Sequence, residues 1–240
     1  QRQAKFCRKH RYHAHYEEAE AYLIKAVEIA EEIDDLSILA ELYNAYGREQ
    51  RARAEEILSQ ALEEPFEGDK EEIQKRADEF LASACDLVKR SVDYAMASGH
   101  RWILARSRFE LAMIHVYSSQ LYDEEAAIGY LEQVLSEGPR ENVFRGHVEE
   151  MYALISVKNE NYVEAAKHLG NACNLLKDMS GRVTVLFSGR LESLLLSELP
   201  DHSVPVVAQG ILDLVHPNSA GNAFLESVVL LCENVLSFHD

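Results

Sequence analysis

Apolar residues recur along this chain with the spacing of amphipathic α-helices. Tyr16, Ala19, Leu23 and Ala26 follow one another in steps of three and four residues, which places them on one face of a helix. No stretch alternates apolar and polar residues over the length of a strand, and the nearest case, 183–185, is read as the start of a helix. The pattern predicts an all-α fold.

The same spacing returns several times. Tyr162, Ala165, Leu169 and Ala172 repeat it, so the segments HYEEAEAYLIKAVEI and NYVEAAKHLGNACNL align residue by residue. The small or β-branched residue that opens each copy recurs every 34 to 39 residues, at Ala19, Ala54, Val88, Ala127 and Ala165. A period of this length accommodates two helices and a turn. One such hairpin cannot bury its apolar face alone, so the units are expected to stack into a solenoid.

These residues resemble the tetratricopeptide repeat (TPR) family, whose motif Tyr-x-x-Ala-x-x-x-Leu-x-x-Ala lies in the second helix of each unit. Pro139 and, roughly, Pro65 match the proline that closes a unit. The runs 26–47 and 91–117 are similar to the longer-period repeats of MalT-type regulators, Rap-type sensors and kinesin light chains. The resemblance implies a right-handed α-solenoid of about five helix-turn-helix units over residues 1–177, followed by a divergent helical C-terminal cap over 178–240.

The resemblance also implies a function. In this family the first helices line a concave groove that binds a peptide or a partner helix, so we expect a non-catalytic protein–protein interaction scaffold. The residues expected to face the groove are Arg8, Arg11, Tyr12, Tyr43, Tyr46, Glu150 and Lys158. Arg8 stands where the first asparagine of the family's carboxylate clamp would fall, so binding of a chaperone C-terminal peptide is not expected.

An alternative keeps this groove but makes it a sensor for a small ligand or a peptide within a larger protein. The chain begins with Gln1 and enters a helical pattern at once, so we expect a piece of a longer or processed protein that acts within a larger protein or complex.

The residues beyond 177 predict three further helices, at about 182–198, 203–215 and 220–237. Their runs Leu194–Leu196 and Val228–Leu231 are apolar nearly all round. Such runs belong either to the interior of a closing cap, which we favour, or to an exposed face for self-association.

Composition and charge narrow the function. Apolar residues make up 47% of the 240, and no run of 18 apolar residues exists, so no membrane span is expected. Residues 1–11 carry five basic and no acidic side chains, whereas residues 17–72 carry 18 acidic and 5 basic ones. The net charge of −17 disfavours nucleic acid and anionic lipid and favours a basic protein partner.

The four cysteines lie far apart in apolar helical contexts and include no CxxC pair, which indicates buried reduced thiols and a cytoplasmic or, as an alternative, nuclear location.

One histidine-rich segment is the only candidate for metal chemistry. Cys7, His10 and His13 share a helical spacing, but zinc needs three or four converging ligands. In the repeat pattern, His15 and Tyr16 match Asn161 and Tyr162 and would occupy a turn. Surface histidines are therefore the preferred interpretation, with a metal site left open. Nucleotide-binding, serine-hydrolase and zinc-protease motifs are absent, so neither a catalytic residue nor a cofactor is predicted.

Overall fold

The computed structural model describes the backbone of residues 2–60, 69–138, 141–179 and 181–239, and the side chains of these ranges except 2–15, 59 and 60. All regular structure in these ranges is helical, which confirms the predicted all-α fold. The chain divides into two compact units, Gln1–Gly138 and Pro139–Asp240. Within the described ranges, no helix combines the length and the apolar character needed to cross a membrane.

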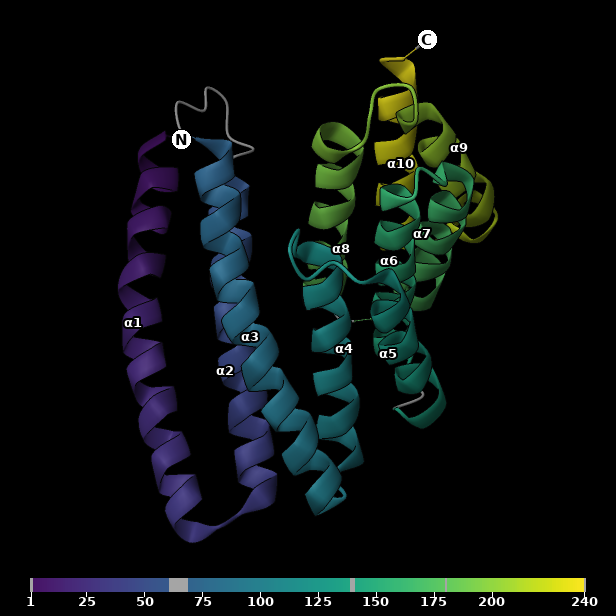
Figure 1. Cartoon of the computed structure of the whole chain (residues 1–240). Coiled ribbons are helices and arrows are strands. Elements are labelled where there is room, and N and C mark those ends of the chain that lie inside the picture. Colours follow the sequence, from purple (N-terminus) through teal and green to yellow (C-terminus); the bar gives the residue numbers. More distant parts are fainter. Residues whose placement is uncertain (1, 61–68, 139–140, 180, 240) are drawn as a thin grey trace. The chain divides into compact units, whose positions relative to one another are not determined.

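The first unit is a series of helical hairpins. Each helix packs on the next one in the chain, and α2 also packs on α4 (Figure 1). The helices are α1 (Arg2–Ile33), α2 (Leu36–Gln60), α3 (Lys70–Ser98), α4 (Arg101–Tyr117) and α5 (Glu124–Glu137).

Short polar residues and glycine set the helix ends in this unit. Asp69 precedes α3, and its carboxylate accepts a hydrogen bond from the backbone N–H of Glu71 at 2.9 Å. Gly99 ends α3 with φ +70°, a conformation that glycine adopts without steric cost. Asp123 caps α5 by accepting a hydrogen bond from Ala126 at 2.9 Å. These caps place the α3–α4 and α4–α5 turns.

The prediction of a turn at His15 and Tyr16 is wrong, because α1 continues through both residues. The corresponding turn before α7 depends on Glu160, with φ +56°, and on Asn161, whose side chain accepts a hydrogen bond from the backbone N–H of Glu164 at 3.3 Å. His15 is a poorer helix cap than asparagine, and the following EEAEA segment favours a continuous helix.

Close approach of α2 to α3 depends on one glycine. A Cβ atom at Gly47 would lie 2.3 Å from Cγ2 of Val88 and 3.2 Å from the backbone oxygen of Ala84. The predicted small positions Ala54, Val88 and Ala127 are all buried in this unit. The repeat pattern thus identifies packing positions, although Ala54 and Val88 lie inside long helices.

The second unit begins with a hairpin of α6 and α7, on which the later helices pack. The elements are α6 (Asn142–Lys158), α7 (Tyr162–Leu176), α8 (Gly181–Ser193), the π-helical turn η1 (Leu194–Glu198), α9 (Val204–Val215), the 3₁₀ turn η2 (His216–Asn218) and α10 (Ala223–Ser237). The three helices predicted after residue 177 are confirmed. The expected boundary at 177/178 lies inside this compact unit, whose limit is at 138/139.

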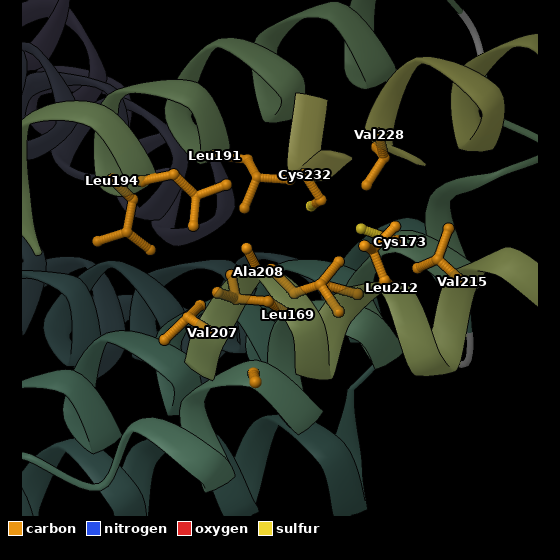
Figure 2. Packing of buried hydrophobic residues seen from close by; sticks show 14 of the residues in the cluster. Leu169, Cys173, Leu191, Leu194, Val207, Ala208, Leu212, Val215, Val228 and Cys232 are labelled. Carbon is orange, nitrogen blue, oxygen red and sulfur yellow. The ribbon is translucent and has the colours of Figure 1, made fainter. Parts of the chain in front are cut away.

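One apolar cluster fills this unit (Figure 2). Leu169 and Cys173 of α7 pack with residues of α8, α9 and α10, including Leu191, Val207 and Cys232. Leu194, Leu195 and Val228 are buried, as expected for a cap interior, whereas Leu196 and Leu230 are exposed. Cys85, Cys173 and Cys232 are free and buried, which confirms the thiol prediction for these three; the side chain of Cys7 lies outside the described residues.

Candidate partner-binding surfaces

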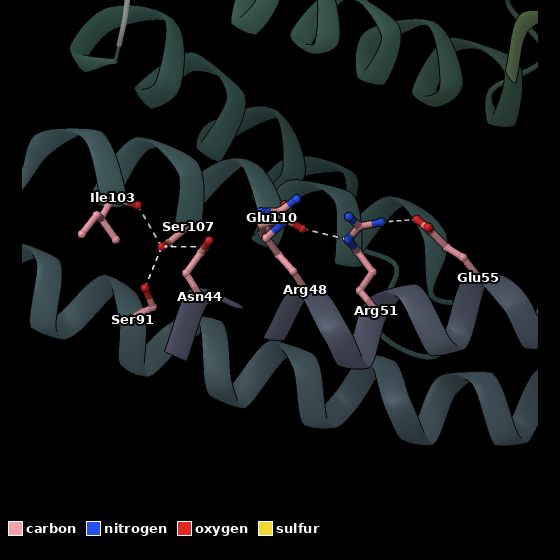
Figure 3. Close-up of polar contacts among 8 residues, drawn as sticks. All are labelled: Asn44, Arg48, Arg51, Glu55, Ser91, Ile103, Ser107 and Glu110. Atoms are coloured by element: carbon pink, nitrogen blue, oxygen red, sulfur yellow. Dashed lines mark hydrogen bonds and ion pairs between the residues drawn. The ribbon is translucent and has the colours of Figure 1, made fainter. Parts of the chain in front are cut away.

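A buried polar seam joins α2 to α4 in the first unit (Figure 3). Asn44 of α2 donates a hydrogen bond through Nδ2 to Oγ of Ser107 in α4 at 3.0 Å. The hydroxyl groups of Ser107 and Ser91 lie 2.7 Å apart, and Ser91 also donates to the backbone oxygen of Ala40 at 2.6 Å. Because these hydrogen bonds join residues of α2, α3 and α4, the seam links three helices.

The seam continues with charged residues (Figure 3). Glu110 of α4 accepts from Nε of Arg51 at 2.8 Å and lies 3.2 Å from Nε of Arg48. Arg51 also pairs with Glu55. Burial alone would lower the pKa of Arg51, but the carboxylates of Glu110 and Glu55 outweigh burial and raise it. Arg51 is therefore held in its charged form between the two carboxylates.

The seam fixes the relative direction of the two helices. Asn44 contacts Ser107, and Arg51 contacts Glu110 further along both helices, so α2 and α4 run in the same direction side by side. Near their N-terminal ends they carry Glu41, which is exposed, and Trp102, which is 41% exposed. We call the surface formed by Ile38, Glu41, Arg48, Trp102 and Arg106 the α2–α4 face.

The tyrosines that the sequence assigned to a groove turn toward α1 instead. Tyr43 is only 4% exposed, donates its hydroxyl hydrogen to Glu31 at 3.2 Å and stacks on Tyr94. Tyr46 donates to Glu20 at 2.7 Å, and burial together with this hydrogen bond raises the pKa of Tyr46 to about 12. Both side chains hold the α1–α2 hairpin together, so the α2–α4 face is defined without them.

Glu150 and Lys158 lie on α6 in the second unit. Glu150 is buried between Arg190 and His147, whose Nδ1 is 3.1 Å from Oε2 of Glu150. Burial would raise the pKa of Glu150, but hydrogen bonds with His147 and Arg190 lower it. Glu150 therefore anchors α8 to α6, whereas Lys158 is exposed at the end of α6. The side chains of the other groove candidates, Arg8, Arg11 and Tyr12, lie outside the described residues.

The proposed histidine site also lies outside the described side chains, since it comprises Cys7, His10, His13 and His15. Among the side chains that are described, no group of three or more His, Cys, Asp or Glu residues is placed to hold a metal ion.

Two hollows open on the first unit. One, of about 520 Å³, lies where α3, α4 and α5 meet, and its lining combines the apolar Met96 and Leu104 with Arg101, Arg108 and Glu137. The two charged residues Arg108 and Glu137 form an ion pair across it. Its mixed lining suits a ligand or a partner side chain that has both apolar and charged parts.

The second hollow, of about 380 Å³, lies between α1, α2 and α3. Arg53 occupies its wall, with its guanidinium carbon 5.3 Å from the ring centre of Tyr16 and 5.9 Å from that of Phe80. The same guanidinium donates to Glu20 and Glu49. Its donors are committed to these internal contacts, so this hollow is a structural junction.

The seam was not predicted from the sequence, although the apolar pattern of α4 contains an indication of it. Ser107 and Glu110 interrupt the apolar run ILARSRFELAMI of α4 at positions that share a helix face. Polar residues on a buried face need partners. Those partners, Asn44 and Arg51, are about 60 residues away in the chain, and only the fold brings them together.

No protein-family model, curated protein or solved structure matches this chain.

Proposed function

We propose that this chain is a non-catalytic protein–protein interaction scaffold, a TPR-like stack of helical hairpins that binds a partner peptide or helix on the α2–α4 face. The observation that carries the proposal is the direct contact between α2 and α4, which run in the same direction across the intervening α3. In a right-handed solenoid of hairpins, alternate helices lie side by side in this way.

The seam supports binding because it makes the face rigid. Asn44, Arg51, Ser107 and Glu110 are held by mutual hydrogen bonds and ion pairs beneath the surface. A partner therefore meets helices that are already positioned, and little conformational entropy is lost on binding. Trp102 supplies the large aromatic surface that is frequent at the centres of protein interfaces.

The charge of the chain indicates the chemistry of the partner. Glu41 is an exposed carboxylate near the N-terminal end of α2, and the net charge of −17 attracts basic partners over longer distances. We propose a partner segment with an apolar side chain for Trp102 and a lysine or arginine for Glu41. The free thiols of Cys85, Cys173 and Cys232 support a reducing, intracellular compartment for this function.

Affinity capture from the native cell lysate tests the proposal. The parent chain is compared with a Glu41→Lys/Trp102→Ala variant and with a matched control, Glu160→Lys/Val163→Ala, which makes the same kind of change at exposed positions around the start of α7. We expect a protein that the parent and control retain and the first variant loses by tenfold or more. Equal retention by all three, at equal thermal stability, would reject the α2–α4 face.

A ligand sensor is a second candidate, which the 520 Å³ hollow favours. A ligand that binds there would raise the melting temperature, and the rise would grow with the logarithm of the ligand concentration above its Kd. Ser136 lines the hollow and is exposed, so Ser136→Trp should fill the space without disturbing the core. A metabolite that stabilises the parent and not this variant would support a sensor, and the absence of any such metabolite would leave the scaffold.

A further inference from the structure

One side of α1 carries a row of exposed large apolar side chains. Tyr22, Ile29 and Ile33 are 68%, 51% and 60% exposed. They are separated by seven and four residues, so they lie along one side of the helix over about 16 Å. We call these three residues the α1 stripe.

The stripe is not the face by which α1 packs on α2. Val27 and Ala30 of α1 are buried in a cluster with Leu39 and Tyr43 of α2. The stripe lies roughly a quarter turn around α1 from Val27 and Ala30, and its side chains stay exposed. Figure 1 shows α1 with α2 along one side. A solenoid whose end helix exposes an apolar row needs another element to cover it.

Charged residues follow the stripe on its solvent side. Glu18, Lys25, Glu28 and Glu32 are all exposed, and their spacing places them on one side of the stripe. Three carboxylates and one ammonium give this row a net charge of −2. An amphipathic helix that buried the stripe would place its own flanking residues against these carboxylates.

We infer that the α1 stripe binds a basic amphipathic helix of a partner protein, which packs on α1 as a further helix of the stack. Apolar side chains at intervals of three, four and seven residues would cover Tyr22, Ile29 and Ile33. Lysine or arginine side chains on one flank would pair with Glu18, Glu28 and Glu32. A second copy of α1 fits less well, because its own flank carries Glu18, Glu28 and Glu32 and offers only Lys25 as a cation for the carboxylates.

This inference shares with the proposed function the premise that the chain binds a protein, but it concerns a separate surface. The proposal for either surface can therefore be rejected while the other stands. The Glu41→Lys/Trp102→Ala variant leaves the α1 stripe intact and serves as the control that separates them.

A designed peptide probes the stripe directly. We would titrate the full chain into a fluorescein-labelled 18-residue helix with leucine on one face and lysine on the flanks, and follow fluorescence anisotropy. Two control peptides are matched to it. The first has the same residues in a scrambled order, so that the leucines share no face, and the second keeps the leucine face but has glutamate in place of lysine. We expect the basic amphipathic helix to bind at least tenfold more tightly than either.

Variants assign the binding to the stripe. Ile29→Ser/Ile33→Ser and the charge reversal Glu28→Lys/Glu32→Lys should each weaken binding of the basic helix tenfold or more. Val163→Ser/Val185→Ser, two equally exposed positions in the second unit, and Glu41→Lys/Trp102→Ala should not.

Two results would overturn the inference: the basic helix still binds the Ile29→Ser/Ile33→Ser variant, or the scrambled peptide binds as tightly as the basic helix. In either case the attraction would be by charge alone. Sedimentation of the chain without peptide gives a further contrary outcome. A homodimer that the Ile29→Ser/Ile33→Ser change dissociates would show that a second copy covers the stripe.

Discussion

At the scale of single residues, buried polar groups pair across the helices of the first unit. Glu110 is buried, accepts a hydrogen bond from Arg51 and forms an ion pair with Arg48. Removing one member of a buried ion pair leaves the other charge desolvated, which costs about 3–5 kcal/mol. The seam therefore contributes specificity to the α2–α4 contact, because a shifted contact would leave these charges unpaired.

Glu110→Ala should lower the free energy of unfolding in urea by about 3 kcal/mol, because it leaves Arg51 buried with only Glu55 as a carboxylate partner. Glu55→Ala should cost less than about 1 kcal/mol, since Glu55 is half-exposed. The double change Arg51→Met/Glu110→Leu should recover most of the loss. Equal effects of the two single changes would show that the seam is not buried as described.

Asp78 makes a pH-dependent link between α3 and the end of α4. It accepts hydrogen bonds from Oγ of Ser118 at 2.7 Å and Oγ of Ser119 at 2.6 Å. Burial would raise the pKa of Asp78, but these hydrogen bonds outweigh burial and lower it. A carboxylate with a lowered pKa stabilises the fold above its unfolded pKa, near 4, and this stabilisation is lost as the pH falls through the folded value.

Asp78→Asn should therefore destabilise the chain at pH 7, by about 2 kcal/mol, because it removes a charged acceptor. The difference between parent and variant should shrink as the pH falls below about 4, where the parent carboxylate also takes up a proton. Urea denaturation at pH 7 and pH 3 measures both values. A difference that stays constant with pH would contradict the lowered pKa.

At the scale of helices, the sequence predicted the helical content and the small packing positions well. It wrongly predicted a turn inside α1. The turn before Tyr162 has the chemistry of a turn, with Asn161 as cap and Glu160 in a left-handed conformation. The segment at His15 shares the flanking pattern but not the cap, and α1 runs on. Periodic apolar spacing is the same in one long helix and in two short ones, so only the capping residues distinguish the two arrangements.

The orientation of the candidate groove residues was less predictable, for a physical reason. The spacing of Tyr43 and Tyr46 showed that they share a region of α2, but it could not show whether that region faced α1 or a groove. In the structure, Glu31 and Glu20 of α1 accept their hydroxyl hydrogens. Orientation about a helix axis depends on partners that lie in other helices.

Two glycines test how closely helices approach. Gly47→Ala places a Cβ 2.3 Å from Val88 and should destabilise the chain by about 1–3 kcal/mol through overpacking between α2 and α3. Gly129→Ala meets no atom within 4 Å and should stabilise α5 by about 0.5–1 kcal/mol through higher helix propensity. Thermal denaturation gives both values. The two changes in stability should have opposite signs. Stabilisation by both changes would show that α2 and α3 are further apart.

At the scale of the whole molecule, the two compact units each have their own apolar core. The second unit buries one contiguous cluster around Leu169, Phe187 and Ile211. We expect a chain cut between Gly138 and Pro139 to give two fragments that each show helical circular dichroism and a cooperative unfolding transition. Fragments that are unfolded alone and fold only when mixed would show that the units depend on one another.

Photo-crosslinking from the α2–α4 face would show whether a partner binds there. Benzoylphenylalanine would replace Glu41 or Trp102 in the full chain, with Val163 as the control position, and the native lysate would be irradiated. We expect one crosslinked partner that is shared by the first two positions and absent from the third. Crosslinking at Val163 alone, or different products at Glu41 and Trp102, would contradict this expectation.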